Sequence, residues 1–476
     1  MMIRRLPDAL KQALLYGSSI ALMKGISLLM LPYVAHHMST EDFGRLEIIA
    51  TLAIIASVLI GMGLDHTLFR FAGVCDDNHQ RRRIGAEIYG LALLIGLCAW
   101  LLGWHGAPSL AVAMNGAASP YELRLMLSIL ALEGCISIPL AWLRMHNKAS
   151  CFFLATTGRA AIQALLVVAL LQAERGVAGM LEAGLIAAML QALVLSYLQI
   201  RSTGLSLSRK TAWQALIYSL PLTGSGLVAF TLNGLDRWIL AQHNSLDEVA
   251  LFSVAAKFSL PVVLLLQPFS MWWAPRRFAI LKGHNGQQRT ANFIALGLTL
   301  ALIIGVMVGL CAPLVIHWLM PANYADSSRY VIGLVTVLLL KEMTELVNLG
   351  CLNGETTGIQ LLINTAAAAV GLLLMLWWTP LYGVWGVIGA LLCAQALRLI
   401  LFFKISQRLL PLPYPTHSVL LLGGISFAWL SVALLSKSDS QQVILIIVAL
   451  SSLLVIAKLR KLIVFPAHWQ RSMAGH

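Results

Sequence analysis

The chain has 476 residues, of which 59% are hydrophobic and only 11% are charged. Soluble proteins carry about 25% charged residues, and a surface that faces water cannot cover a chain with a mean hydropathy of +0.82. These values exclude a soluble protein and predict a polytopic membrane protein. The net charge of +13 is therefore attributed to basic cytoplasmic loops, with no nucleic-acid partner expected.

Long apolar segments follow one another along the whole chain. A helix that spans a membrane needs about 20 predominantly apolar residues. On that rule the predicted spans are residues 13–35, 43–64, 85–103, 123–143, 152–172, 178–199, 213–235, 249–273, 291–318, 329–350, 359–378, 383–403, 417–436 and 442–458. The expected fold class is an all-α polytopic membrane protein with about 14 transmembrane helices.

The loops between these segments alternate in charge. If the N-terminus is cytoplasmic, the inner connections and tail hold about 22 Lys and Arg residues, whereas the outer connections hold about 5. Cytoplasmic loops of membrane proteins carry such an excess. The sequence therefore predicts that both termini are cytoplasmic.

Two stretches of the chain share a layout at a shift of about 206 residues. The matched pairs are His37 with His243, Ser39 with Ser245, Asp42 with Glu248, and Arg70 with Arg276. Six spans separate the copies, so both enter the membrane in the same direction, as in transporters built from parallel repeats. We expect a six-helix bundle over residues 1–205, a second over 206–410, and two additional helices with a basic tail over 411–476.

Eight charged residues fall inside predicted spans, where each costs about 2.5–3.5 kcal/mol at the bilayer centre. They are Lys24, Glu133, Arg159, Lys257, Lys341, Glu342, Glu345 and Arg398. Such residues usually face a bundle interior or a watery cavity. Two alternatives stay open: Arg159 and Arg398 extend towards the cytoplasmic interface, and Lys341 pairs with Glu345 on one helix face.

The cations among these residues predict an anionic ligand. Lys24 and Lys257 have no acidic residue within four positions, and each lies in one of the two matched stretches. A phosphate or pyrophosphate group complements such a set of cations. The predicted substrate-binding residues are Lys24, Arg159, Lys257, Lys341 and Arg398.

The acidic residues predict ion coupling or the acidic part of a cavity. The candidates are Glu133, Glu342, Glu345 and Asp236. Glu133 lies alone in its span beside Gly134, and a buried carboxylate can bind and release a proton as access alternates. The alternative is a permanent ion pair with Lys24 or Arg159.

Signatures of catalysis and of cofactor binding are missing from the sequence. It contains no P-loop, no GxSxG, no HExxH and no dinucleotide fingerprint. The seven cysteines are scattered without a CxxC motif and predict no metal site. We therefore expect a transporter without catalytic residues or cofactors, driven by an ion gradient or the membrane potential.

Three stretches resemble one family of transporters. Residues 236–240 (DRWIL), followed by residues 249–255 (VALFSVA) and Lys257, resemble the seventh and eighth helices of Wzx-type polysaccharide flippases, which belong to the multidrug/oligosaccharidyl-lipid/polysaccharide exporter superfamily. Residues 39–44 (STEDFG), after Pro32, and residues 382–390 (YGVWGVIGA) resemble the same family. Ala250 replaces a usual Gly and Phe252 a usual Tyr, and these departures bear on sugar preference.

The resemblance implies a fold and a function. The implied fold is a pair of six-helix bundles in the bacterial inner membrane that moves undecaprenyl-pyrophosphate-linked oligosaccharide from the cytoplasmic to the periplasmic leaflet by alternating access. Its expected partners are the lipid bilayer and the polymerase and glycosyltransferases of the same surface polysaccharide pathway. The alternatives are a multidrug or cation antiporter of the same superfamily and a lipid II flippase. A membrane-embedded glycosyltransferase is disfavoured because the outer loops are short.

Overall fold

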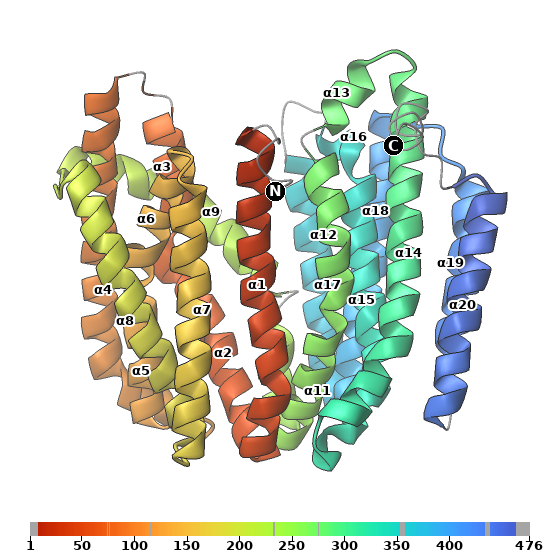
Figure 1. Cartoon of the computed structure of the whole chain (residues 1–476), viewed down its shortest axis with the longest axis horizontal. Coiled ribbons are helices and arrows are strands. Elements are labelled where there is room, and N and C mark those ends of the chain that lie inside the picture. The colour runs from red at the N-terminus through yellow and green to blue at the C-terminus, as the bar shows by residue number, and fades with distance from the viewer. Residues whose placement is uncertain are drawn as a thin grey trace, which may run out of the picture. The chain divides into compact units, whose positions relative to one another are not determined.

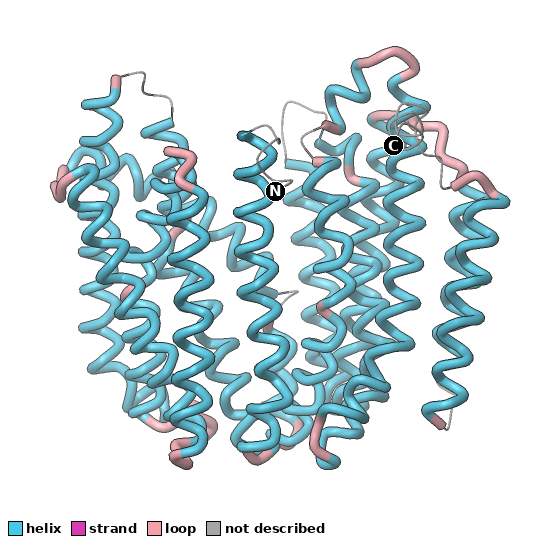
Figure 2. The backbone as a smooth tube through the Cα atoms, in the orientation of Figure 1, coloured by secondary structure: helices cyan, strands magenta, loops and turns pink. Residues whose placement is uncertain are grey.

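A computed structural model of the chain describes residues 8–73, 75, 77–114, 116–231, 234–274, 276–352, 358–433 and 438–462. Every regular element in these ranges is a helix, as Figure 2 shows. Hydrocarbon offers no hydrogen-bond partner to the backbone, so a spanning segment must satisfy its own N–H and C=O groups. The predicted all-α fold class is confirmed.

The chain forms two compact units, Met1–Ala250 and Leu251–His476. The helices of the first unit are α1 (Asp8–His37), α2 (Thr40–Gly61), α3 (Leu64–Gly73), α4 (Asn78–Ala113), α5 (Pro120–Ala131), α6 (Glu133–Met145), α7 (Ala149–Gln172), α8 (Gly176–Thr203), α9 (Arg209–Thr231), α10 (Leu235–His243) and the start of α11 (Leu246–Ser259). Helices α9 and α10 belong to this unit because they pack against α2. The predicted division into bundles over residues 1–205 and 206–410 stays a prediction.

The second unit begins within α11. Its further elements are α12 (Pro261–Trp273), α13 (Arg277–Lys282), α14 (Gly286–Leu319), η2 (Ala322–Ser327), α15 (Ser328–Val347), α16 (Leu349–Leu352), α17 (Gly358–Tyr382), α18 (Val384–Leu409), α19 (Thr416–Ala433) and α20 (Asp439–Leu459). Helix α18 packs against both α15 and α17, whereas α19 and α20 pack against α14, as Figure 1 shows. Apolar side chains of α14, α19 and α20 share one buried cluster that includes Leu310, Leu422 and Leu453.

The predicted spans coincide with helices or with pairs of helices separated by a break. Within the described ranges, 12 spans are long and apolar enough to cross a membrane. The two other predicted segments correspond to α9 and α15, and α15 carries Lys341, Glu342 and Glu345. Three of the spans are interrupted, between α2 and α3, α5 and α6, and α11 and α12.

The break between α5 and α6 lies against α4. A Cβ atom on Gly96 would stand 2.3 Å from the carbonyl oxygen of Ala131, and one on Gly134 would stand 2.9 Å from that of Ala92. Only glycine permits two helix backbones to approach so closely. This contact places Glu133, the first residue of α6, at a fixed depth in the first unit.

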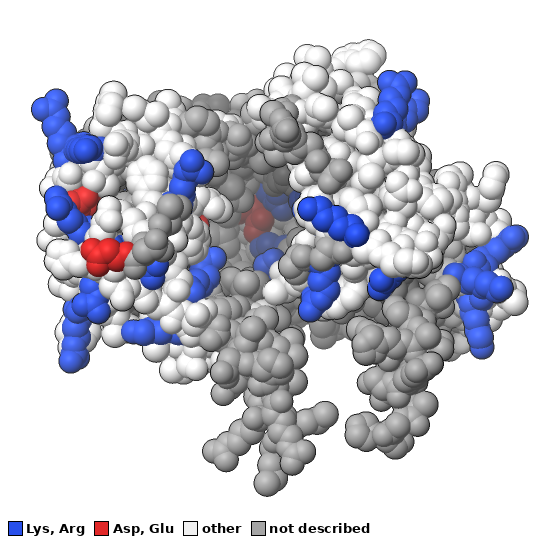
Figure 3. Space-filling view, turned by 90° about the horizontal axis from the view of Figure 1, so that it is seen from above, with Lys and Arg blue, Asp and Glu red and all other residues white. Residues whose placement is uncertain are grey.

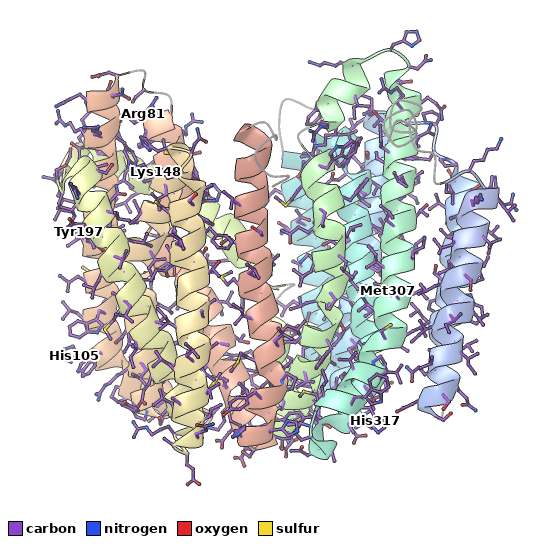
Figure 4. The ribbon with its side chains drawn as sticks, viewed as in Figure 1. Arg81, His105, Lys148, Tyr197, Met307 and His317 are labelled. Atoms are coloured by element: carbon purple, nitrogen blue, oxygen red, sulfur yellow. The ribbon has the colours of Figure 1, made fainter. Side chains whose placement is uncertain are left out.

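Basic side chains lie on the face of the molecule that Figure 3 shows. Figure 4 places Arg81 and Lys148 at the same end of the first unit, and His317 at the end of α14 that lies away from α13. On the face seen in Figure 3, Lys and Arg predominate over Asp and Glu on both units. The distribution agrees with the charge alternation of the loops, and the cytoplasmic position of the termini stays a prediction.

Candidate functional site

Glu133 lines a cavity inside the first unit. The cavity measures about 350 Å³, and its polar side chains are those of Ser57, Asp65, His66, Glu133, Ser137 and Thr223. They come from the last turn of α2, the first turn of α3, the first turns of α6 and the middle of α9. Two of the helix breaks therefore open onto one polar space.

The break between α2 and α3 forms one wall of this cavity. Helix α2 ends at Gly61, and Met62 adopts a left-handed conformation with φ 46°, its N–H donating to the carbonyl oxygen of Val58. The last carbonyl groups of a helix have no partner in a following turn and carry its negative dipole end. Asp65 follows in the first turn of α3. The break thus places Asp65 and the end of α2 beside the cavity.

Each carboxylate of the cavity has a cation nearby. Oδ2 of Asp65 lies 3.9 Å from Nη2 of Arg144, and the charge of Arg159 acts on Glu133. The described residues include no ion pair of Glu133 with Arg159 or Lys24 at 4.0 Å or less. Neither Arg144 nor Arg159 belongs to the cavity lining. The cavity lining therefore contains two carboxylates and no Lys or Arg.

Arg159 is bound by the neighbouring helix. Its Nη1 donates a hydrogen bond of 3.1 Å to Oε1 of Gln191 on α8, and Nε2 of Gln191 donates one of 3.0 Å to the carbonyl oxygen of Ala155. Gln191 is buried. These bonds fix the guanidinium between α7 and α8.

The other two single cations predicted to bind substrate lie on α1 and α11. Lys24 is exposed on α1, which packs along α7. Lys257 is half-buried near the end of α11, where Phe252, Val254 and Phe258 are buried. Lys24 belongs to the first unit and Lys257 to the second.

In the second unit, Arg398 joins three helices. Its Nη2 donates a 2.7 Å hydrogen bond to Oε1 of Glu345 on α15, and its Nε donates one of 2.8 Å to Oδ1 of Asn364 on α17. Its guanidinium lies 5.5 Å from the ring centre of Phe402. Only 12% of the Arg398 side chain is exposed. Arg398, predicted to bind substrate, therefore already has a carboxylate and an amide oxygen as hydrogen-bond partners.

Further polar and charged residues of α15 lie near the contact between Arg398 and Glu345. Nδ2 of Asn348 donates to the second carboxylate oxygen of Glu345 at 3.1 Å. Glu342 lies within electrostatic range of Lys341, Glu345 and Arg398. The predicted residues Lys341, Glu342, Glu345 and Arg398 are thus brought together.

Arg277, the first residue of α13, belongs to the same electrostatic group. Burial lowers the pKa of its guanidinium from the ordinary value, while the charge of Glu345 raises it. Sequence reasoning assigned Arg277 only to a basic loop. Its position could have drawn attention to it, because Arg277 follows soon after Trp273, where an apolar span ends.

Asp236 lies in a different place, at the junction of α10 with α2. Its Oδ1 accepts a 2.8 Å hydrogen bond from the backbone N–H of Arg237, whose Nε lies 3.4 Å from Oε2 of Glu47. Asp236 and Glu47 are both buried. Close by in the first unit, Arg45 donates two hydrogen bonds, of 3.0 and 2.8 Å, to Glu122. These contacts join α2 to α10 and to α5.

Several of these residues were not predicted from the sequence. Asp65 and His66 of the cavity were not predicted, although residues 61–63 (GMG) before them interrupt an apolar run. Glu122 was missed too, although Ser119 three positions earlier forms a capping box with it. No group of three or more His, Cys, Asp or Glu suited to a metal ion occurs among the described residues.

Solved structures show which known fold this chain shares. The lipid II flippase MurJ in an inward closed conformation matches with a TM-score of 0.72 at 15% identity, over 94% of this chain and 98% of that one. An inward-facing multidrug resistance MATE family transporter of the MOP superfamily matches with a TM-score of 0.59 at 16% identity, over 82% and 94%. An outward-facing one gives 0.54 at 15%, over 85% and 96%. The fold is that of MurJ and the MATE transporters.

A family model gives the particular family. The model described as "Polysaccharide biosynthesis protein" matches residues 9–281, which is more than half of the chain. The chain belongs to the polysaccharide biosynthesis protein family, and the resemblance to Wzx-type flippases is confirmed at this level. No curated protein matches the sequence.

Proposed function

We propose that the protein is a flippase that moves undecaprenyl-pyrophosphate-linked oligosaccharide from the cytoplasmic to the periplasmic leaflet of the bacterial inner membrane by alternating access. The observation that carries the proposal is a family match over residues 9–281 in a chain that keeps charged residues inside its apolar helices. The family and the fold support a transporter, and the proposal includes no enzymatic activity. Polymerase and glycosyltransferases of the same pathway are the proposed partners.

The cations provide the chemistry for the pyrophosphate. Lys24, Arg159, Lys257, Lys341 and Arg398 are the proposed contacts, because charge-assisted hydrogen bonds to phosphate oxygens are strong. Lys24 supports this role best, since its side chain is exposed on α1 and no described ion pair holds it. Arg398 would first have to leave Glu345 and Asn364, to which it donates hydrogen bonds.

The acidic residues provide the proposed coupling. Glu133 is the first candidate because its carboxylate lines the cavity of the first unit. Glu342 and Glu345 are the candidates in the second unit, and Asp236 is a further one at the junction of α10 with α2. A carboxylate that binds a proton in one conformation and releases it in the other would couple transport to a proton gradient.

Proteoliposomes with a fluorescent short-chain prenyl-pyrophosphate disaccharide test the flippase function. Wild-type protein should move the label between leaflets, and Lys24→Ala and Lys257→Ala should each slow it at least about tenfold, as loss of a charge-assisted contact predicts. Lys148→Ala is the matched control, since Lys148 is exposed at the end of α7. Full activity in both lysine variants would refute the assignment of these lysines.

The same vesicles test coupling and the alternative function. Glu133→Gln should remove the response of the flipping rate to an imposed pH gradient, because a glutamine cannot carry the proton. The likeness to MATE transporters makes a multidrug antiporter the second candidate. Efflux of a cationic dye without any movement of the lipid probe would favour that function instead.

A further inference from the structure

The cavity of the first unit is too large for a bare ion. Its volume is about 350 Å³, which would hold about a dozen water molecules at about 30 Å³ each. Pockets for small organic ligands begin near about 300 Å³. A desolvated cation would instead need several oxygen atoms converging at short range. The size fits one sugar ring with its hydroxyl groups.

The lining offers acceptors in excess. When ionised, Asp65 and Glu133 can only accept hydrogen bonds. Thr223 already donates its hydroxyl proton to the carbonyl oxygen of Ser219, and Ser57 donates its own to that of Ile54, so both have only lone pairs left for a ligand.

Side-chain hydrogen-bond donors are fewer in this lining. They are the hydroxyl of Ser137 and the imidazole of His66, and the lining contains no Lys or Arg. A phosphate group would find acidic oxygens and no cation here, so the pyrophosphate must bind elsewhere. A ligand that complements the cavity is uncharged and rich in hydroxyl or amide donors.

We propose that this cavity is a sugar subsite that takes one uncharged ring of the transported glycan and rejects a uronic acid. The inference rests on the proposed flippase function and adds a substrate class to it. Asp65 and Glu133 accept hydrogen bonds from ring hydroxyls, and the hydroxyl of Ser137 donates to a ring or hydroxyl oxygen. Arg144 lies 3.9 Å from Asp65, and the charge of Arg159 acts on Glu133, so each carboxylate has a cation on its own side of the wall that is not part of the lining.

The preference for a neutral sugar over a uronic acid follows from the hydrogen bonds that each can make with the carboxylates of the wall. A hydroxyl group satisfies a carboxylate of the wall, whereas a sugar carboxylate brings a like charge and no donor to the same place. A site built to bind hydroxyl groups strongly rejects a ligand that cannot supply them, and juxtaposed like charges add a repulsive element. The protein would therefore handle glycans whose ring at this position is neutral.

Binding to purified full-length protein in nanodiscs tests the proposal with three probes. They are farnesyl pyrophosphate alone, the same lipid carrying N-acetylglucosamine, and the same lipid carrying glucuronic acid, with affinities measured by native mass spectrometry. Wild-type protein should bind the neutral sugar at least about tenfold more tightly than the acidic one. Asp65→Asn and Glu133→Gln should each reduce this ratio, and the double variant should bring it to about twofold or less.

Glu182→Gln is the matched control. Glu182 belongs to the same unit but accepts hydrogen bonds from Tyr121 and Arg175 away from the cavity, so the ratio should not change. Equal binding of both sugars by wild-type protein would overturn the sugar subsite alone. Failure of all three lipids to bind would overturn the proposed function as well. Sodium-dependent thermal stabilisation that Glu133→Gln abolishes, together with equal sugar binding, would replace the subsite with a cation site.

Discussion

Arg398 shows how a cation is retained inside an apolar helix bundle. A lone buried guanidinium would be very unfavourable, and a charged residue in a span needs paired or hydrogen-bonded neighbours. Here one carboxylate, one amide oxygen and one aromatic ring share the guanidinium, from three helices of the second unit. The guanidinium therefore connects α15, α17 and α18 through these contacts.

A double-mutant cycle on Arg398 and Glu345 measures this joining. Each of Arg398→Ala and Glu345→Ala should lower the free energy of unfolding by about 1–3 kcal/mol, since each leaves a charged partner without its hydrogen bond. The double variant should lose less than the sum of the two, with a coupling of about 1–2 kcal/mol. Denaturant unfolding in detergent gives the values.

Arg408→Ala provides the matched control for this cycle. Arg408 is exposed and lies on the same helix, α18, so its removal should change stability by less than about 0.5 kcal/mol. Strict additivity of Arg398→Ala and Glu345→Ala would contradict the ion pair.

The sequence could identify which charged residues lie in the membrane but not how they pair. Lys341 and Glu345 are four positions apart, so their proximity follows from helix geometry alone. The partner of Glu345 that the structure adds is Arg398, 53 positions away. Arg45 and Glu122 are 77 positions apart. Pairs at such separations depend on how helices pack, which hydropathy and spacing do not record.

At the scale of the helix, two glycines on α4 face different surroundings. A Cβ on Gly96 would stand 2.3 Å from the carbonyl oxygen of Ala131, whereas nothing lies within 4 Å of a Cβ on Gly106. Gly96→Ala should therefore destabilise the first unit by about 1–3 kcal/mol, because α4 and the end of α5 must separate.

Gly106→Ala is the control on the same helix, and it should stabilise the protein by up to about 1 kcal/mol through better helix propensity. Thermal unfolding of both variants measures the difference. Equal effects of the two substitutions would show that the close approach of α4 to α5 is wrong.

Hydropathy predicted the positions of the spans and missed their breaks. The predicted segment 123–143 is two helices that meet at Leu132, and 249–273 is two that meet at Leu260. An apolar run remains apolar across a kink, so composition gives no signal there. Pro261 and residues 61–63 do give one, because proline and glycine mark helix boundaries. The cavity at Glu133 depends on two of these breaks and was not predictable as a space.

At the scale of the whole molecule, orientation in the membrane is the main open prediction. Lys148 and Glu174 flank the two ends of α7, while Asn285 precedes α14 and His317 lies in its last turn. If both termini are cytoplasmic, cysteines introduced at Glu174 and His317 should react in intact cells with a maleimide that cannot cross the membrane.

Cysteines at Lys148 and Asn285 should react with this reagent only after the cells are lysed. Each helix thus provides its own control, and the unsubstituted chain gives the background of the native cysteines. Labelling at Lys148 in intact cells would invert the orientation of the first unit.

The three charges of α15 have a consequence for synthesis of the chain. Lys341, Glu342 and Glu345 would each oppose partition into lipid by about 2.5–3.5 kcal/mol, so α15 does not leave the translocon on its own hydropathy. The partner of Glu345 is made 53 residues later, which a ribosome adding about 5–20 residues per second reaches after about 3–10 s. During that interval the nascent helix must be sheltered by the insertion machinery or by the helices already released. We therefore expect α15 to integrate together with other segments, and Arg398 to stabilise it in the membrane once that residue is made.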